Sequence, residues 1–247
     1  MSDPKPTIDW TVARCLAAWS ALAYQEADVY DTHTGAAAIV RTTPDGDIIV
    51  AFRGSKSAKD FIHDAEAWFS ELMWSDNDVV AEVHHGFLED FEAVNVEVVQ
   101  RVRALIAVMP KAPVFVTGHS LGGALAKLCA LEFSRQKIDV TGVYTFGAPR
   151  VGNRAFREIY NRSLFHKTFR VVNQNDLVPR LPGYFAGYRH TGMEFFMLPG
   201  TGYIPQPALW EKIIADIFGL YGAYRHRDDV LITEHFIRAY QERMKLV

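Results

Sequence analysis

The chain has 247 residues, of which 49% are hydrophobic and 22% are charged, and this composition is typical of a globular protein with a sizeable core. The length is near the upper limit for one hydrophobic core and predicts a single domain over residues 1–247. A net charge of −3 and a pI near 6.3 give no reason to expect nucleic-acid binding. No apolar run approaches the roughly 20 residues of a membrane-spanning helix.

The cysteines and the N-terminus set further limits. Cys15 and Cys129 both fall in apolar helical patterns, which predicts two buried free thiols and no disulfide framework or zinc site. The first residues include Pro4, Pro6 and Asp9 and do not have the pattern of a signal peptide. We therefore expect either an intracellular protein or one whose signal has been removed.

The first part of the chain predicts a helix and then a hairpin. Apolar residues recur at helical spacing over Thr11–Tyr24, which indicates a helix packed on the core. Ala36–Arg41 and Asp47–Phe52 are strand-like and are joined by the turn sequence Thr43-Pro44-Asp45-Gly46. We expect these two segments to form an antiparallel hairpin at the start of the sheet.

Two helices are predicted next, separated by a connection. Ser57-Ala58-Lys59-Asp60 has the pattern of a capped helix start. The apolar residues that follow share one face of this helix; they include Phe61, Ile62, Ala65, Trp68 and Phe69. Val83–Phe87 is interpreted as a short connection, and Phe91–Met109 has helical spacing up to Pro110.

The motif that organises the chain is Thr117–Gly123, T-G-H-S-L-G-G. Its G-x-S-x-G pattern, centred on Ser120, lies between a strand-like segment, Val114–Thr117, and the helix-forming Ala124–Leu131. Strand, sharp turn and helix are the context of a nucleophile elbow, in which the serine hydroxyl projects above the sheet. A phosphate-binding loop is excluded because Ala124-Leu125 stands where Lys-Ser/Thr is required. The remaining alternative is a glycine-rich turn with a surface serine.

Strand-like and helix-like segments alternate beyond this motif. Strands are predicted at Val140–Phe146, Thr168–Asn173 and Met193–Leu198, and helices at Ala155–Tyr160, at Pro207–Tyr221 and from Ile232 to the C-terminus. This alternation predicts an α/β fold with a largely parallel sheet covered by helices on both faces.

A serine hydroxyl is a weak nucleophile that requires a neighbouring base, and on such folds an acid and then a histidine follow the serine along the chain. Asp176 lies three residues past the predicted strand Thr168–Asn173 and is the favoured acid, because ligands gather at the carboxyl ends of parallel strands. The alternative is an aspartate that only completes a turn before Pro179.

Three histidines follow Asp176 in the chain. His190 precedes a predicted strand and is expected at the opposite end of the sheet. His226 lies among basic residues, where a solvated loop is the simpler interpretation. We favour His235, the last histidine, at the start of the final helix, although a packed helix histidine remains the alternative.

The elbow also predicts two donors for an oxyanion. One is the backbone N–H of Leu121, directly after Ser120. The other is expected from Gly54-Ser55 at the end of the second hairpin strand, where the Ser55 hydroxyl adds a further donor. A plain turn after a strand is the alternative for this segment.

Five segments in consistent order resemble the class 3 lipases, the group of the filamentous-fungal triacylglycerol lipases. They are Phe52–Ser55, Val83–Phe87, Gly118–Gly123, Phe146–Asn153 and Asn175–Pro179. The resemblance implies an α/β-hydrolase fold with a helical lid after Ser57 that includes Phe61, Ile62, Ala65 and Trp68. It also implies Ser120, Asp176 and His235 as a catalytic triad and Ser55 and Leu121 as oxyanion donors. Residues 202–229 match no motif of this family, and the disulfides of its fungal members have no counterpart here.

We therefore expect a serine carboxylic-ester hydrolase, and specifically a triacylglycerol lipase, that needs no metal or cofactor. Its substrate would be a lipid or ester met at an oil–water interface by a monomeric protein. A feruloyl-type esterase and a phospholipase A1 remain alternatives within the same chemistry. A non-catalytic lipid-binding relative is the alternative from another class, and the intact serine, aspartate and histidine argue against it. For the lid, the alternative is a fixed helix packed on the core.

Overall fold

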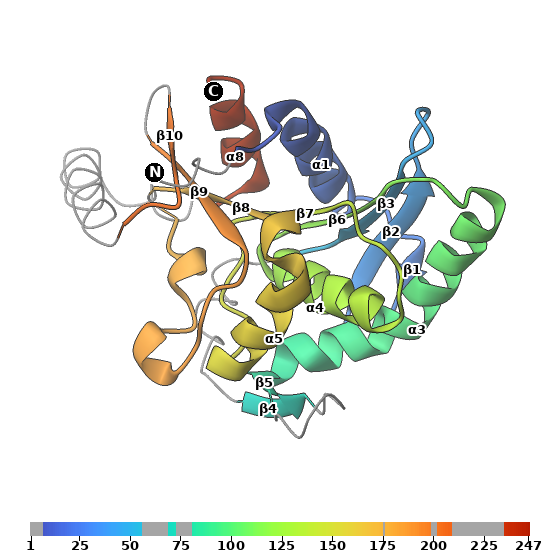
Figure 1. Ribbon diagram of the computed structural model, residues 1–247, viewed down its shortest axis with the longest axis horizontal. Coiled ribbons are helices and arrows are strands. Elements are labelled where there is room, and N and C mark those ends of the chain that lie inside the picture. The colour runs from blue at the N-terminus through green and yellow to red at the C-terminus, as the bar shows by residue number, and fades with distance from the viewer. Residues whose placement is uncertain (1–6, 56–68, 73–80, 175, 199–201, 209–234) are drawn as a thin grey trace.

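The computed structural model describes residues 7–55, 69–72, 81–174, 176–198, 202–208 and 235–247. Within these ranges the centre of the molecule is an eight-stranded sheet in the order β1-β2-β3-β6-β7-β8-β9-β10 (Figure 1). The strands are β1 (Val29–Tyr30), β2 (Ala37–Thr42), β3 (Ile48–Phe52), β6 (Val114–His119), β7 (Gly142–Phe146), β8 (Thr168–Asn173), β9 (Met193–Met197) and β10 (Tyr203–Pro205). A separate antiparallel pair is formed by β4 (Phe69–Leu72) and β5 (Ala81–His84).

The middle of the sheet is parallel and its borders are antiparallel. Each neighbouring pair from β3 through β6, β7 and β8 to β9 is parallel, whereas β1, β2 and β10 join antiparallel. The register pairs Phe52 with Gly118, His119 with Phe146, and Phe146 with Val171. The carboxyl ends of β3, β6, β7 and β8 therefore meet at one edge of the sheet.

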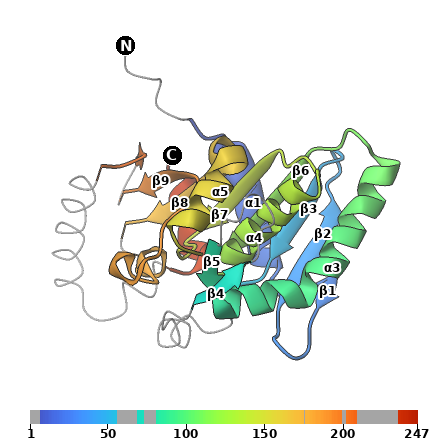
Figure 2. The same ribbon diagram turned by 60° about the horizontal axis from the view of Figure 1, so that its bottom comes forward.

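Helices cover both faces of the sheet (Figures 1 and 2). One face packs against α1 (Trp10–Leu22) and α8 (Ile237–Met244), and the other against α3 (His85–Val108), α4 (Leu121–Arg135) and α5 (Arg154–Leu164). Short 3-10 turns complete the described helical elements: η1 (Phe165–Lys167), η2 (Val178–Arg180) and η3 (Tyr184–Ala186). Among all these helices, none is both long and apolar enough to cross a membrane.

The alternation of side chains along each strand explains the two cores. In β3, Ile48, Val50 and Phe52 pack toward α3 and α4, whereas Ile49 and Ala51 pack toward α1. Successive strand residues point to opposite faces, so a strand that is buried on both sides is apolar throughout.

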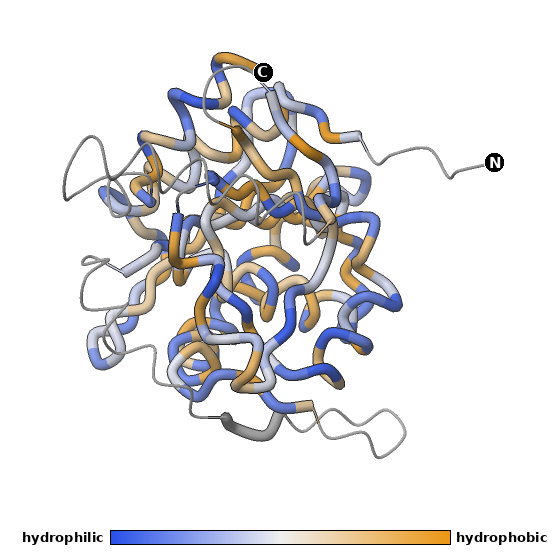
Figure 3. Tube along the Cα trace, turned by 90° about the vertical axis from the view of Figure 1, so that its left-hand side faces the viewer, coloured by the Kyte–Doolittle hydropathy of each residue, from blue (hydrophilic) through white to orange (hydrophobic). Residues whose placement is uncertain are grey.

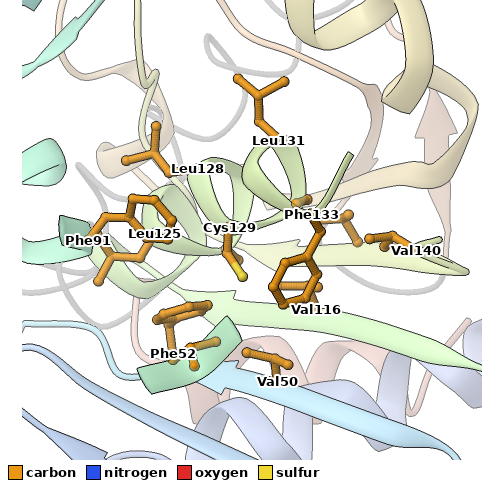
Figure 4. Packing of buried hydrophobic residues seen from close by; sticks show 14 of the residues in the cluster. Val50, Phe52, Phe91, Val116, Leu125, Leu128, Cys129, Leu131, Phe133 and Val140 are labelled. Atoms are coloured by element: carbon orange, nitrogen blue, oxygen red, sulfur yellow. The ribbon is translucent and has the colours of Figure 1, made fainter. Parts of the chain in front are cut away.

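Helix α4 is the most enclosed helix of the described chain. Every residue from Gly122 to Phe133 is buried, because the helix lies between the sheet and the helices α3 and α5. Cys129 points toward Phe52 of β3 and Val116 of β6, whereas Leu128 points away from these strands (Figure 4). A helix in such a central position is expected to be apolar around most of its circumference, and Lys127 and Glu132 are the charged residues of this buried stretch. In the hydropathy trace of Figure 3, blue and orange alternate along the outer segments of the chain.

Most predicted elements are present, with the hairpin confirmed as antiparallel and β8 confirmed at its predicted bounds. The prediction that Val83–Phe87 forms only a short connection is wrong. Val83 and His84 pair with β4, and α3 already begins at His85. With only four residues, β5 is too short for an alternation of buried and exposed side chains to be distinguished from a loop in the sequence. The last helix begins at Ile237 rather than near Ile232, because Phe236 still has extended backbone angles.

Two other predictions need correction. Cys129 is a buried free thiol as predicted, but Cys15 is an exposed one, because the buried stripe of α1 runs through Ala13, Leu16 and Ala17 and leaves residue 15 outside it. The predicted helix Ser57–Phe69 does not include Phe69, which belongs to β4.

Several predictions fall on the remaining parts of the chain. The proposed lid residues Phe61, Ile62, Ala65 and Trp68 lie outside the described residues, as does most of Pro207–Tyr221.

Candidate active site

Ser120 occupies a strained turn between β6 and α4. Its φ of 57° and ψ of −130° are sparsely populated for any residue with a side chain. The Ser120 N–H donates to the Phe146 carbonyl oxygen at 2.9 Å, and the Gly123 N–H donates to the Ser120 carbonyl oxygen at 2.9 Å. The neighbouring strand β7 and the first turn of α4 thus hold the serine in this conformation.

The positions of Gly118 and Gly122, on either side of Ser120, leave no room for a side chain. A Cβ atom on Gly118 would lie 2.2 Å from the backbone of Gly122, and one on Gly122 would lie 2.2 Å from the Phe52 carbonyl oxygen. No other residue fits at such distances. The turn is therefore tight, and α4 begins directly against the end of β3.

His235 connects Ser120 to Asp176. Its Nε2 atom lies 2.9 Å from Ser120 Oγ, and its Nδ1 atom lies 2.9 Å and 3.0 Å from the two carboxylate oxygens of Asp176. The three residues come from the turn after β6, the loop after β8 and the segment before α8. All three are at most 2% exposed, so these hydrogen bonds form away from water, where they are stronger.

The Asp176 carboxylate has two further donors. The Val178 N–H donates to Oδ1 at 2.9 Å, and the Tyr240 hydroxyl of α8 donates to Oδ2 at 2.6 Å. The Tyr240 oxygen in turn accepts the Asn173 N–H at 3.1 Å. Burial, together with the charge of Asp176, raises the pKa of Tyr240 well above its ordinary value, so the hydroxyl keeps its proton and remains a donor.

Gly147 lies directly beneath the aspartate and histidine. Its φ is +60°, and a Cβ atom there would lie 2.7 Å from Asp176 Oδ2, 3.0 Å from the Tyr240 hydroxyl and 3.2 Å from His235 Nδ1. The turn after β7 therefore needs glycine for its backbone conformation and for the space that these three groups occupy.

His119 links the elbow to the backbone of His235. Its Nε2 atom lies 2.5 Å from the His235 carbonyl oxygen, and its Nδ1 atom lies 2.8 Å from the Tyr24 hydroxyl. Because a carbonyl only accepts, Nε2 carries the proton and Nδ1 accepts from Tyr24. Burial, and secondarily the neighbouring His235, lower the pKa of His119 well below its ordinary value. The neutral ring lies 4.7 Å from that of His235, centre to centre.

Similarity to known proteins identifies the family to which this chain belongs. A model of the class 3 lipase family matches residues 49–186, more than half of the chain. This chain belongs to the class 3 lipase family. The match contains Ser120 and Asp176 and ends before His235.

Individual relatives agree with the family. The chain is 36% identical over 183 residues to a lipase of Rhizomucor miehei, which covers 72% of this chain and 47% of that protein. It is 35% identical over 174 residues to the secreted mono- and diacylglycerol lipase 1 of Fusarium solani, with coverage of 68% and 50%. The chain thus spans about half the length of the curated relatives it matches.

A solved structure extends the comparison to three dimensions. It is a triacylglycerol lipase whose catalytic centre is described as a serine protease triad, and it superimposes with a TM-score of 0.68 at 27% identity. The similarity covers 79% of this chain and 82% of the other. The fold of this class 3 lipase family member is therefore the α/β-hydrolase fold.

The two segments predicted to stabilise an oxyanion lie beside each other. Leu121 is the first residue of α4, where backbone N–H groups lack partners within the helix. The segment after β3 runs past this turn, because a Cβ atom on Gly54 would lie 2.6 Å from the His119 carbonyl oxygen. Ser55 follows as a half-buried residue. The role of Ser55 and Leu121 stays a prediction.

Sequence reasoning missed the second layer of this site. Tyr240, Gly147, His119 and Tyr24 all contact the serine, histidine or aspartate segments. Gly147 and His119 lie in segments that the sequence singles out, but the contacts of all four residues were not predicted. Among the other histidines, His190 lies 2.8 Å from the Pro179 carbonyl oxygen through its Nε2 atom. His226 lies outside the described residues.

Proposed function

We propose that this protein is a serine carboxylic-ester hydrolase, and specifically a triacylglycerol lipase. The observation that carries the proposal is the position of His235, which lies 2.9 Å from both Ser120 Oγ and Asp176 Oδ2. A buried imidazole between a carboxylate and a serine hydroxyl is the arrangement that makes the hydroxyl nucleophilic.

In the first half of the reaction, Ser120 Oγ attacks the ester carbonyl carbon and His235 Nε2 takes the hydroxyl proton. Asp176 accepts the His235 Nδ1–H bond, which fixes the tautomer and stabilises the imidazolium. The same proton then passes from His235 to the departing alcohol oxygen as the ester C–O bond breaks. The acyl group remains on Ser120.

In the second half, water attacks the acyl-enzyme and gives its proton to His235. Collapse of the tetrahedral intermediate returns that proton to Ser120 and releases the carboxylic acid. In both halves the carbonyl oxygen becomes negative, and we assign the Leu121 N–H and Ser55 as its donors. One such donor typically lowers the activation barrier by about 3–4 kcal/mol.

The choice of substrate is supported by the family. Lipases and a mono- and diacylglycerol lipase are among the similar proteins, so an acylglycerol is the substrate class we propose, met by a monomer at an oil–water interface. A feruloyl-type esterase and a phospholipase A1 use the same serine chemistry and differ in the alcohol or acid that they accept.

A hydrolysis panel tests this proposal. Purified protein would be given p-nitrophenyl esters of graded chain length, emulsified tributyrin, a phosphatidylcholine dispersion and methyl ferulate, with Ser120→Ala as the matched control. We expect release of fatty acid from tributyrin that is lost in the control. Preferential cleavage of the phospholipid or of methyl ferulate would overturn the lipase assignment, and no ester hydrolysis at all would overturn the hydrolase assignment.

A further inference from the structure

The tip of the loop after β8 exposes two adjacent aromatic side chains. Phe185 is 104% exposed relative to an extended reference, and Tyr184 is 56% exposed. Both belong to η3, in the orange segment at the lower left of Figure 1. An aromatic ring in water loses the free energy that burial would provide, so an exposed pair of rings marks a surface suited to an apolar partner.

Hydrogen bonds fix the shape of this tip. Arg189 Nη1 donates to the Tyr184 carbonyl oxygen at 2.9 Å, and the Arg189 guanidinium lies 3.7 Å from the centre of the Tyr184 ring. The Gly187 N–H donates to the same carbonyl oxygen at 3.1 Å, with Gly187 in a left-handed conformation of φ +93°. The rings are therefore exposed on an ordered turn.

The base of the loop is attached to the body of the protein. Tyr188 is fully buried, and the Arg189 N–H donates to the Gly152 carbonyl oxygen at 2.8 Å. On the other side of the tip, Arg150 Nη1 donates to the Pro182 carbonyl oxygen at 2.8 Å. These contacts leave Phe185 as the most projecting side chain of a supported loop.

The loop that carries the tip has only cationic side chains among its charged residues, whereas Glu82 lies close enough to Tyr188 at its base for an electrostatic interaction. Residues 177–193 contain Arg180, Arg189 and His190 and no aspartate or glutamate. Arg154, which is close enough to Tyr184 for an electrostatic interaction, has a side chain that is 82% exposed, although it pairs with Glu158 at 2.8 Å. Aromatic rings beside arginines are the combination that favours insertion at a lipid surface with negative head groups.

The loop also has a defined position relative to the proposed reaction. Asp176 and Phe185 belong to the same connection, which leaves β8 at the carboxyl edge where Ser120 lies and leads to the amino end of β9. At the base of the tip, the Arg189 N–H donates to the carbonyl oxygen of Gly152, which follows the carboxyl end of β7. The tip is therefore attached to segments that leave the sheet at the edge where ester bonds would be cleaved.

We propose that Tyr184 and Phe185 form an anchor that inserts into an anionic lipid surface, with Arg189 holding the rings and adding positive charge. The anchor would bring the lipase proposed above to the surface of its lipid substrate. This role of the anchor rests on the proposed lipase function. The occupant is a lipid surface that carries anionic phospholipid head groups.

The test uses the full chain with Ser120→Ala, so that binding is measured without hydrolysis. Co-sedimentation with phosphatidylcholine vesicles, with and without phosphatidylglycerol, gives the affinity of this protein and of its Phe185→Asp and Phe185→Trp forms. We expect Phe185→Asp to weaken binding to phosphatidylglycerol vesicles by about tenfold to a hundredfold, the effect of losing one buried aromatic side chain. Phe185→Trp should retain binding, because Trp also partitions to lipid interfaces.

The matched control is Val108→Asp, which introduces the same charge at a residue that is 75% exposed at the end of α3. It should bind vesicles as the parent does, and equal thermal unfolding midpoints would establish that both aspartate variants fold.

Three outcomes would overturn the anchor: unchanged binding in Phe185→Asp, equal losses in both aspartate variants, or no preference for phosphatidylglycerol. A dimer in sedimentation velocity that Phe185→Asp abolishes would also overturn it, by making a second copy the occupant. Failure of the hydrolysis panel together with Phe185-dependent vesicle binding would instead refute the enzyme and leave the anchor standing.

Discussion

Helix α4 has a group of buried polar side chains at its N-terminus and a different one beside its second turn. At the N-terminus, Ser120, His235 and Asp176 form a continuous series of hydrogen bonds. Beside the second turn, the fully buried Lys127 has one hydrogen-bond partner within the described part of the chain, the Pro149 carbonyl oxygen at 3.4 Å. Its neighbour Arg170 pairs with Glu194 at 2.8 Å, while the Arg170 Nε and Nη1 atoms have no hydrogen-bond partner among the described residues.

The comparison separates burial from function. Both groups contain ionisable side chains removed from water. In the second group, burial lowers the pKa of Lys127 well below its ordinary value, and the positive charge of Arg170 lowers it further. Of these two groups of described residues, only the first connects an imidazole to a serine hydroxyl in a strained turn. The series of hydrogen bonds therefore identifies the proposed site better than an unusual buried charge does.

The largest expected effect comes from removing the base. His235→Ala should lower turnover about as much as Ser120→Ala, on the order of a million-fold, and the double variant should be no worse because the two residues act as a unit. Hydrolysis of p-nitrophenyl butyrate by the three variants measures this. His226→Ala is the matched control and should cost less than about tenfold, since the proposal gives His226 no part in the reaction. A larger loss of turnover in His226→Ala than in His235→Ala would assign the role of base to His226.

A smaller but diagnostic effect is expected from Gly147→Ala. The added methyl group has to displace the Asp176 carboxylate or the His235 ring, and a misplacement of about 1 Å typically costs about a hundredfold in rate. The control is Gly46→Ala, where φ is +89° but no atom lies within 4 Å of the new Cβ. Each variant should lose roughly 1–2 kcal/mol of stability from the left-handed backbone, and only Gly147→Ala should lose activity. Equal activities would show that the methyl group is accommodated without moving the aspartate.

Tyr240→Phe should have a smaller effect on rate. It removes the donor to Asp176 Oδ2, and a hydrogen bond to a charged group contributes about 1.5–3 kcal/mol, which corresponds to roughly tenfold to a hundredfold if the whole loss falls on the reaction. Tyr160→Phe provides the comparison, because the Tyr160 hydroxyl is equally buried but bonds to Thr168 at 2.8 Å. We expect the kcat of ester hydrolysis to fall in Tyr240→Phe alone. A similar fall in both variants would assign Tyr240 a structural role only.

The smallest effect on activity is expected from Lys127→Met, which should instead raise stability by about 1–3 kcal/mol at pH 7 by removing a buried amine. The unfolded lysine is protonated below about pH 10.4, whereas the folded one has a lowered pKa, so unfolding takes up a proton between these two pKa values. Wild-type stability therefore rises with pH in that window, and the advantage of Lys127→Met shrinks as pH approaches 10. Urea unfolding between pH 7 and 10 measures this change.

Lys167→Met is the control for that experiment, because its lysine is 38% exposed and pairs with Asp139 on the surface. It should give no comparable increase. An advantage of Lys127→Met that stays constant across the pH range would contradict the lowered pKa.

The sequence predicted the parts of this site that have local patterns. Ser120 was recognisable because strand, glycines and helix surround it, and Asp176 because it follows a predicted strand at the edge where ligands gather. The neighbours that support them were not recognisable. Tyr24 lies 95 residues before His119, and Tyr240 lies 64 residues after Asp176, so only the folded chain brings each pair together. The pairing of β4 with β5 is a different case, because the two strands are close in sequence but have only four residues each, too few for an alternating pattern to be distinct.

The central claim is that Ser120 is the nucleophile activated through His235 and Asp176. Its most direct test is labelling with a fluorophosphonate, followed by mass spectrometry of the peptides, on the wild type, Ser120→Ala and Asp176→Asn. The account predicts one phosphonylated residue, Ser120, in the wild type, no label in Ser120→Ala and strongly slowed labelling in Asp176→Asn, which leaves His235 without its charged partner. Labelling at another serine, or an Asp176→Asn rate equal to that of the wild type, would contradict it.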